Sequence, residues 1–209
     1  MLVGLLITIL SGPLIDELTE PGANLWIQVA FTATLLVAVF SMVASRVWFI
    51  VGLLLTITAA GGTVIAGVTG SETAQFATVL ALLAYCVIAL IFTLEVLIRP
   101  GRITANQIIG AISVYLLAGV ALSLINLVIY QLLPGSFKGL EKAPGVAVDG
   151  SSLFYYTFVT MTTPGYGDIT PQRPLAEAVA YLTAIAGQFY IAILVAYLVG
   201  GYLSQGDSE

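Results

Sequence analysis

The chain has 209 residues, of which 59% are hydrophobic and only 8% are charged, and its net charge is −5. Soluble proteins carry about 25% charged residues, so this composition predicts a membrane protein. A single cysteine and no histidine exclude an internal disulfide and a zinc-type ligand cluster, and no basic run indicates nucleic acid.

The apolar segments set the number of membrane crossings, because a helix needs about 20 apolar residues to span the hydrocarbon core. The first run, residues 2–15, is short and contains Pro13. We interpret it as a kinked first helix, with a re-entrant segment or a signal peptide as alternatives. Later runs are longer, and together they predict about six transmembrane helices. These runs are residues 24–44, 47–68, 74–98, 108–133 and 175–203.

Basic residues predict the orientation of these helices. Arg46, Arg99 and Arg102 lie in short connections, which the positive-inside rule places in the cytoplasm. Trp26 and Trp48 then fall near opposite faces of the membrane, where indole rings prefer the interface. This orientation puts both chain ends in the cytoplasm.

The fourth apolar run lacks the charges that a voltage sensor needs. It holds Glu95 and ends at Arg99, which stand four residues apart and are expected to pair. Moving one charge through the membrane field yields only about 2.3 kcal/mol per 100 mV, so sensing requires several charges. We therefore expect residues 1–103 to form a peripheral four-helix region that does not respond strongly to voltage.

A polar stretch with Gly and Pro, residues 134–150, is expected to be an extracellular loop, and a distinctive motif follows it. Residues 160–168 read Thr-Met-Thr-Thr-Pro-Gly-Tyr-Gly-Asp. In the selectivity filter of potassium channels, which this motif resembles, a dehydrated cation is bound by a column of carbonyls, and an extended chain offers this column only where alternate residues accept positive φ. Gly165 and Gly167 stand at alternate positions and supply that freedom.

This motif resembles the selectivity filter of tetrameric potassium channels, usually TxTTVGYGD. The resemblance implies a K+ pathway lined by Thr163, Pro164, Gly165, Tyr166 and Gly167. It also implies a short pore helix over residues 153–162, capped by Ser151 or Ser152. Residues expected to support the filter are Thr162, Asp168, Tyr155 and Tyr156, although the two tyrosines could instead be simple interface anchors.

Pro164 departs from the family pattern, where Val or Ile is usual. Proline keeps its carbonyl but lacks an N–H, and it biases Thr163 away from the α region. Either a restraint behind the filter is lost, which would weaken selectivity, or that N–H was never needed.

The last helix is expected to line the pore. Pro174 suits its first turn, and Gly187 lies 22 residues after Gly165 (187 − 165), similar to the gating hinge of relatives. Close helix packing is the alternative role for Gly187. The residues expected to face the cavity are Gln188, Ile191, Val195, Val199 and Leu203, although the apolar ones would equally suit lipid contact.

The sequence therefore predicts an all-α membrane protein that forms a homotetramer in the plasma membrane. Residues 104–203 would be the pore domain, a helix–pore loop–helix module, and residues 204–209 a cytoplasmic tail without a nucleotide-binding or other regulatory domain. The predicted function is passive K+ conduction, with K+ as cargo, no cofactor and no enzymatic activity. The alternatives are a weakly selective cation channel and a non-conducting or regulatory protein with a vestigial filter.

Overall fold

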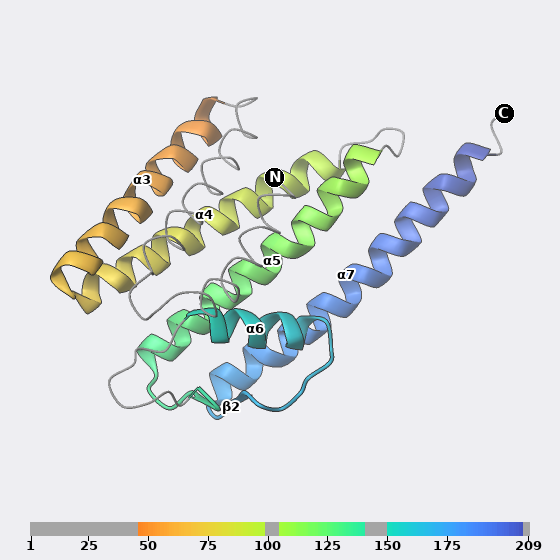
Figure 1. The fold of residues 1–209 in the computed structure, drawn as a ribbon. Helices are drawn as coiled ribbons and strands as arrows, with labels where there is room; N and C mark the ends of the chain where they lie inside the picture. Colours follow the sequence, from red (N-terminus) through yellow and green to blue (C-terminus); the bar gives the residue numbers. More distant parts are fainter. Residues whose placement is uncertain (1–45, 99–104, 141–149, 207–209) are drawn as a thin grey trace, which may run out of the picture. The chain divides into compact units, whose positions relative to one another are not determined.

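The computed structural model describes residues 46–98, 105–140 and 150–206. The predicted segments 2–15 and 24–44 lie outside these ranges, as do Trp26, Arg99 and Arg102. The described part is almost entirely helical (Figure 1), which confirms the predicted all-α class. The chain forms two compact units, Met1–Phe92 and Thr93–Glu209.

The first unit contains α3 (Arg46–Thr69) and most of α4 (Glu72–Ile98), which are joined by a tight turn. Gly70 has a φ of 64°, a left-handed conformation that ends a helix at low cost when the residue is glycine. The Ser71 hydroxyl then accepts a hydrogen bond from the Ala74 N–H at 3.4 Å, as an N-cap residue does. Cys86 is buried, as expected for a packing residue.

The second unit contains α5 (Ala105–Leu132), α6 (Gly150–Met161) and α7 (Pro174–Gly206). The short helix α6 packs against both long helices, and α5 also packs against α7. Two very short strands, β1 (Phe137–Lys138) and β2 (Thr170–Pro171), pair antiparallel near the ends of α5 and α7 (Figure 1). A core of buried side chains joins these elements: Ile129, Phe137, Leu140, Leu153, Tyr156, Ile169 and Ala176.

Helix boundaries agree with the sequence expectations to within a few residues, with one correction at α6. This helix begins at Gly150 in the described part of the chain, so it starts three residues before the predicted residue 153, and Ser151 and Ser152 lie in its first turn. Pro174 is the first residue of α7, as predicted. Glu177 follows in the first turn of α7, where a carboxylate is favourable beside the positive end of the helix dipole.

The segment after α5 is more ordered than a polar extracellular loop would be. Ser136, Phe137 and Leu140 are buried, and the backbone of this segment pairs with β2. The first part of the predicted loop 134–150 thus contributes buried side chains to the core, and only Phe137–Lys138 within it form a strand. Residues 141–149 lie outside the described ranges.

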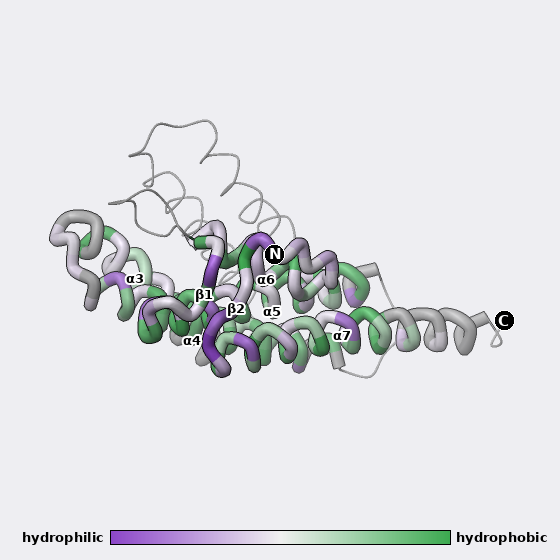
Figure 2. Tube along the Cα trace, turned by 90° about the horizontal axis from the view of Figure 1, so that it is seen from below, coloured by the Kyte–Doolittle hydropathy of each residue, from purple (hydrophilic) through white to green (hydrophobic). Residues whose placement is uncertain are grey.

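Three of the described helices are long and apolar enough to cross a membrane: Thr73–Glu95, Gln107–Leu132 and Pro174–Leu194. A shorter apolar stretch, Gly52–Ile65, lies in α3. Figure 2 shows hydrophobic colours along α4 and α5 and hydrophilic colours around β1 and β2. Hydroxyls in the helices donate to the carbonyl four residues earlier, which lets them sit in apolar surroundings. Examples are Thr56, Thr78, Ser113, Ser123 and Thr183.

Candidate functional site: the loop between α6 and α7

The candidate filter begins where α6 ends. The Thr162 N–H donates to the Phe158 carbonyl at 2.9 Å, and its hydroxyl donates to the same carbonyl at 2.6 Å. The Thr163 N–H donates to the Thr160 carbonyl at 3.1 Å, one residue closer than the helical spacing. The last turn of α6 thus tightens, and the chain leaves the helix at Thr163.

Backbone φ is positive at every second residue of the motif. Thr163 has a φ of 74°, Gly165 of 54° and Gly167 of 79°, while Pro164 and Tyr166 between them are not in the positive region. Over residues 163–167, residues with positive φ therefore alternate with residues without it.

The positive φ of Thr163 was not predicted from the sequence. Thr163 is the only non-glycine residue with positive φ in the described part of the chain. A β-branched residue rarely adopts this conformation, which costs about 1–3 kcal/mol and persists only where neighbouring structure enforces it. The hydrogen bond to Thr160 supplies part of that enforcement.

Pro164 fits its position in this pattern. The pyrrolidine ring fixes φ near −65°, and the alternation places a residue without positive φ between Thr163 and Gly165. Proline therefore has the sign of φ that the loop needs at this point.

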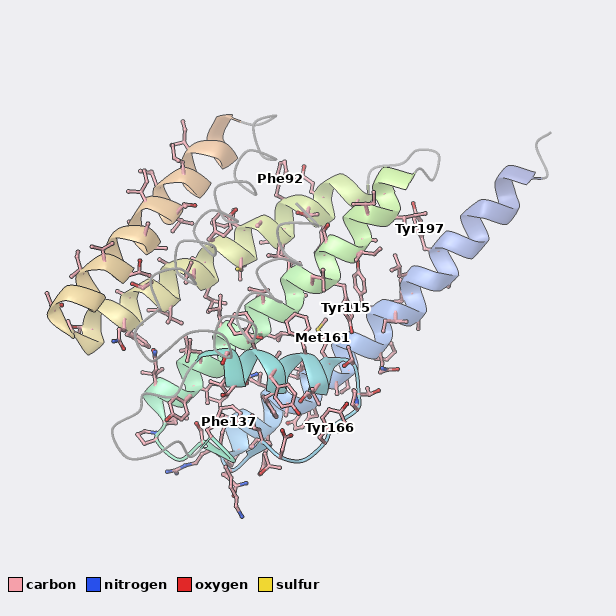
Figure 3. All side chains as sticks on the ribbon, viewed as in Figure 1. Phe92, Tyr115, Phe137, Met161, Tyr166 and Tyr197 are labelled. Carbon is pink, nitrogen blue, oxygen red and sulfur yellow. The ribbon has the colours of Figure 1, made fainter. Side chains whose placement is uncertain are left out.

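The motif is open to solvent in the single chain. Residues 162–168 are all exposed, and the Tyr166 side chain is 71% exposed. Figure 3 shows Tyr166 on the loop below α6, at the same end of the unit as Phe137. The loop is therefore exposed along its whole length in the single chain.

A side-chain contact holds the outer end of the loop. The Tyr155 hydroxyl of α6 donates a hydrogen bond to the Asp168 carboxylate, and this bond is the main cause that raises the pKa of Tyr155 above 10.0. The neutral hydroxyl is favoured because a phenolate beside a carboxylate would be repelled. Tyr155 and Asp168, both predicted to support the filter, thus contact each other.

Tyr156 faces another direction. Its side chain is buried and packs edge-on against Phe137, with ring centroids 5.4 Å apart and planes at 69°. This geometry is favourable for an aromatic pair. Tyr156 therefore anchors α6 to the segment after α5, and in this single chain its described contacts are with the core.

A buried hydrogen bond between α5 and α6 was not predicted from the sequence. Asn126 is fully buried, and its Nδ2 donates to the Thr157 hydroxyl at 2.9 Å. The same hydroxyl donates to the Leu153 carbonyl at 2.7 Å. A lone asparagine inside an apolar run was the only available signal, because buried polar groups are usually paired.

Helix α7 contacts α6 at Gly187. This glycine is buried, and a Cβ there would overlap the Met161 carbonyl oxygen. Met161 lies where α6 meets α7 (Figure 3). The structure therefore gives Gly187 the close-packing role that was the alternative to a hinge, and α7 runs through it without interruption. The hinge role stays a prediction.

The residues predicted to line the cavity follow Gly187 on α7. Gln188 and Ile191 are exposed in the single chain. Val195, Val199 and Leu203 belong to the same helix, and their side chains lie outside the described part of the structure.

Tyr190, which lies between Gln188 and Ile191 on α7, makes contacts that were not predicted from the sequence. The Tyr190 hydroxyl donates to the Ala111 carbonyl of α5 at 2.6 Å, and its ring lies 5.5 Å from that of Tyr115. Tyr190 therefore connects α7 to α5.

Comparison with known proteins gives this geometry a family context. Residues 111–200 match the model of a family described as ion channels. A stretch of 49 residues is 45% identical to the mouse and human proteins named potassium voltage-gated channel subfamily A member 10. This stretch is 23% of the chain and 10% of each relative, so the similarity spans about a tenth of the relatives' length.

Proposed function

We propose that the chain is one subunit of a homotetrameric potassium channel. In this proposal K+ passes along the backbone carbonyls of residues 163–167. The observation that carries it is the alternation of positive φ at Thr163, Gly165 and Gly167 within a TTPGYGD motif. The match of residues 111–200 to ion channels and the potassium-channel relatives support the same conclusion.

The tetramer follows from the geometry of ion coordination. A dehydrated cation must be surrounded by oxygens, and one loop offers carbonyls from one side only. Four copies around an axis would complete the ring. The exposed apolar side chains of α7, among them Phe189 (63%) and Ile193 (66%), would then meet neighbouring copies or lipid.

Selectivity for K+ over Na+ is proposed to survive Pro164. Its φ is compatible with the alternating backbone, and its carbonyl remains available. The Tyr155–Asp168 hydrogen bond supports the outer end of the loop. A weakly selective channel remains the second candidate because the N–H at this position is missing.

The remaining features of the proposal concern placement and gating. The channel would lie in the plasma membrane with both chain ends in the cytoplasm, bind no cofactor and catalyse no reaction. Gln188, Ile191 and the following residues of α7 would line the cavity. No charged ladder exists in α4, so conductance would depend only weakly on voltage.

The test is cation flux from liposomes that contain the purified full-length protein. K+ and Rb+ should pass, Na+ should pass far more slowly, and the protein should have the mass of a tetramer. Equal K+ and Na+ fluxes would favour the weakly selective channel, and no flux would favour the non-conducting alternative. A stable dimer without a central pore would contradict the proposal.

A matched pair of variants makes the flux test specific for the filter. Gly165→Ala and Gly135→Ala both place alanine at positive φ, at 54° and 74°. Only Gly165 lies in the motif. We expect Gly165→Ala to abolish K+ flux and Gly135→Ala to retain it.

A further inference from the structure

We propose that residues 136–140, which we call the outer clamp, position the outer end of the filter loop. Within the clamp, Gly139 is the positioning residue. The proposal deepens the channel function proposed above and rests on it for its effect on conduction. The contacts on which the proposal is based join the clamp to residues 168–172.

The first contacts of the clamp are backbone hydrogen bonds. Phe137 pairs with Pro171 and Lys138 with Thr170 in the β1–β2 pair. The Gln172 N–H also donates to the Ser136 carbonyl at 2.8 Å. These bonds attach the chain directly after the filter to the segment that follows α5.

Gly139 makes the closest approach to the filter loop. Its φ is 88°, and a Cβ built on it would overlap the Asp168 carbonyl oxygen, with the Asp168 carbonyl carbon at 3.0 Å and the Ile169 Cα at 3.2 Å. All of these atoms belong to the backbone and cannot turn away as a flexible side chain can. Only glycine fits at this position, both for its conformation and for its lack of a side chain.

The clamp is itself anchored in the core. Phe137 packs against Tyr156 of α6 at 5.4 Å, and Phe137 and Leu140 are each only 6% exposed. Ile169, on the filter side, is buried in the same core. The clamp therefore cannot shift without disturbing packing around α6.

Asp168 is held from two directions as a result. The Tyr155 hydroxyl bonds its carboxylate, and the backbone of Gly139 lies against its carbonyl. Gly167, the last residue with positive φ in the filter, directly precedes it. Displacing the clamp would thus move the residue that fixes the outer end of the carbonyl column.

The experiment compares Gly139→Ala with Gly135→Ala in the full-length protein. Gly135 has a φ of 74°, but a Cβ there meets nothing within 4 Å. Both variants carry the strain of alanine at positive φ, and only Gly139→Ala meets Asp168. The readouts are hydrogen exchange of the Gln172 amide, which is bonded to the Ser136 carbonyl of the clamp, and K+ flux at low and high external K+.

We expect exchange of the Gln172 amide to be about tenfold faster in Gly139→Ala than in Gly135→Ala, because the contact between the clamp and the chain after the filter loop opens more often. Gly139→Ala should also lose flux at low K+ and regain part of it at high K+, since bound K+ favours the ordered filter. Recovery by K+ would not occur in a chain that is simply misfolded.

The outcomes separate the two proposals. Equal exchange in the two variants would overturn the clamp, whatever the flux. Faster exchange in Gly139→Ala, with a wild type that conducts no cation, would support the clamp and refute the channel function. If Gly139→Ala does not assemble, Phe137→Leu weakens the contact with Tyr156 more gently. Unchanged exchange in that variant would overturn the clamp.

Discussion

The contact between Gly187 and Met161 allows a quantitative prediction about how the packing of α7 against α6 affects stability. We expect Gly187→Ala to destabilise the protein, although alanine is the better helix former. The new Cβ would overlap the Met161 carbonyl oxygen and lie 3.0 Å from its carbonyl carbon and its Cγ. Met161 is only 1% exposed and ends α6, so it has little room to withdraw.

The magnitude follows from two opposing terms. Replacing glycine by alanine inside a helix gains about 1 kcal/mol. Overpacking a filled site costs about 1–3 kcal/mol. The net effect of Gly187→Ala is then about 0–2 kcal/mol of destabilisation by these two rules. A helical glycine with free space should show the gain alone, and Gly61 in α3 is such a site because nothing lies within 4 Å of its Cβ position.

The assay is thermal unfolding of wild type, Gly187→Ala and Gly61→Ala, followed by circular dichroism in the same detergent. Gly61→Ala should unfold above Gly187→Ala, and a difference of about 2 kcal/mol would separate their Tm values by roughly 4–8 °C. If Gly187→Ala is as stable as Gly61→Ala, the close contact with Met161 does not exist in the protein. A hinge role for Gly187 would then be favoured over close packing.

Other contacts of the second unit, Thr93–Glu209, give further predictions. Because the pKa of Tyr155 is raised, its bond to Asp168 stabilises the protein fully below about pH 10 and is lost as the pH rises further. Thermal unfolding should show a larger loss in wild type than in Tyr155→Phe, where Tyr156, whose pKa is also raised by burial, still contributes; equal profiles would contradict it. Thr157→Val removes the partner of Asn126 and should cost about 1–3 kcal/mol in an unfolding experiment. Adding Asn126→Leu should recover most of that loss, and no recovery would show that the bond is not the cause. Pro164→Val should raise either K+/Na+ selectivity or open probability under bi-ionic conditions, and identical values in both proteins would make Pro164 a neutral variant.

Much of the helical framework could be predicted because hydropathy and length are local properties of the sequence. The ends of α5 and α7 fall within a few residues of the expected segments, and Pro174 marked the start of α7. Positive φ at Gly165 and Gly167 followed from the chemistry of a carbonyl column.

The contacts that were missed depend on neighbours far away in the sequence. A strand of two residues has no periodicity to detect, so β1 was hidden in a loop rich in Gly and Pro. Gly139 lies in a loop, and nothing in the sequence near it indicates that the Asp168 backbone lies against it. Asn126 and Tyr190 have partners 31 and 79 residues away, and such pairings leave no local trace.

These distant contacts explain how a loop with a strained residue keeps its shape. The positive φ of Thr163 must be enforced by its surroundings, and its N–H is bonded to Thr160 in the last turn of α6. Met161, in the same turn, lies against Gly187 of the inner helix. A displacement of α7 at Gly187 would therefore disturb the turn that holds Thr163. In the proposed channel, a movement of α7 would then be coupled to Thr163 through the contact of Gly187 with Met161, and no charged sensor would be required.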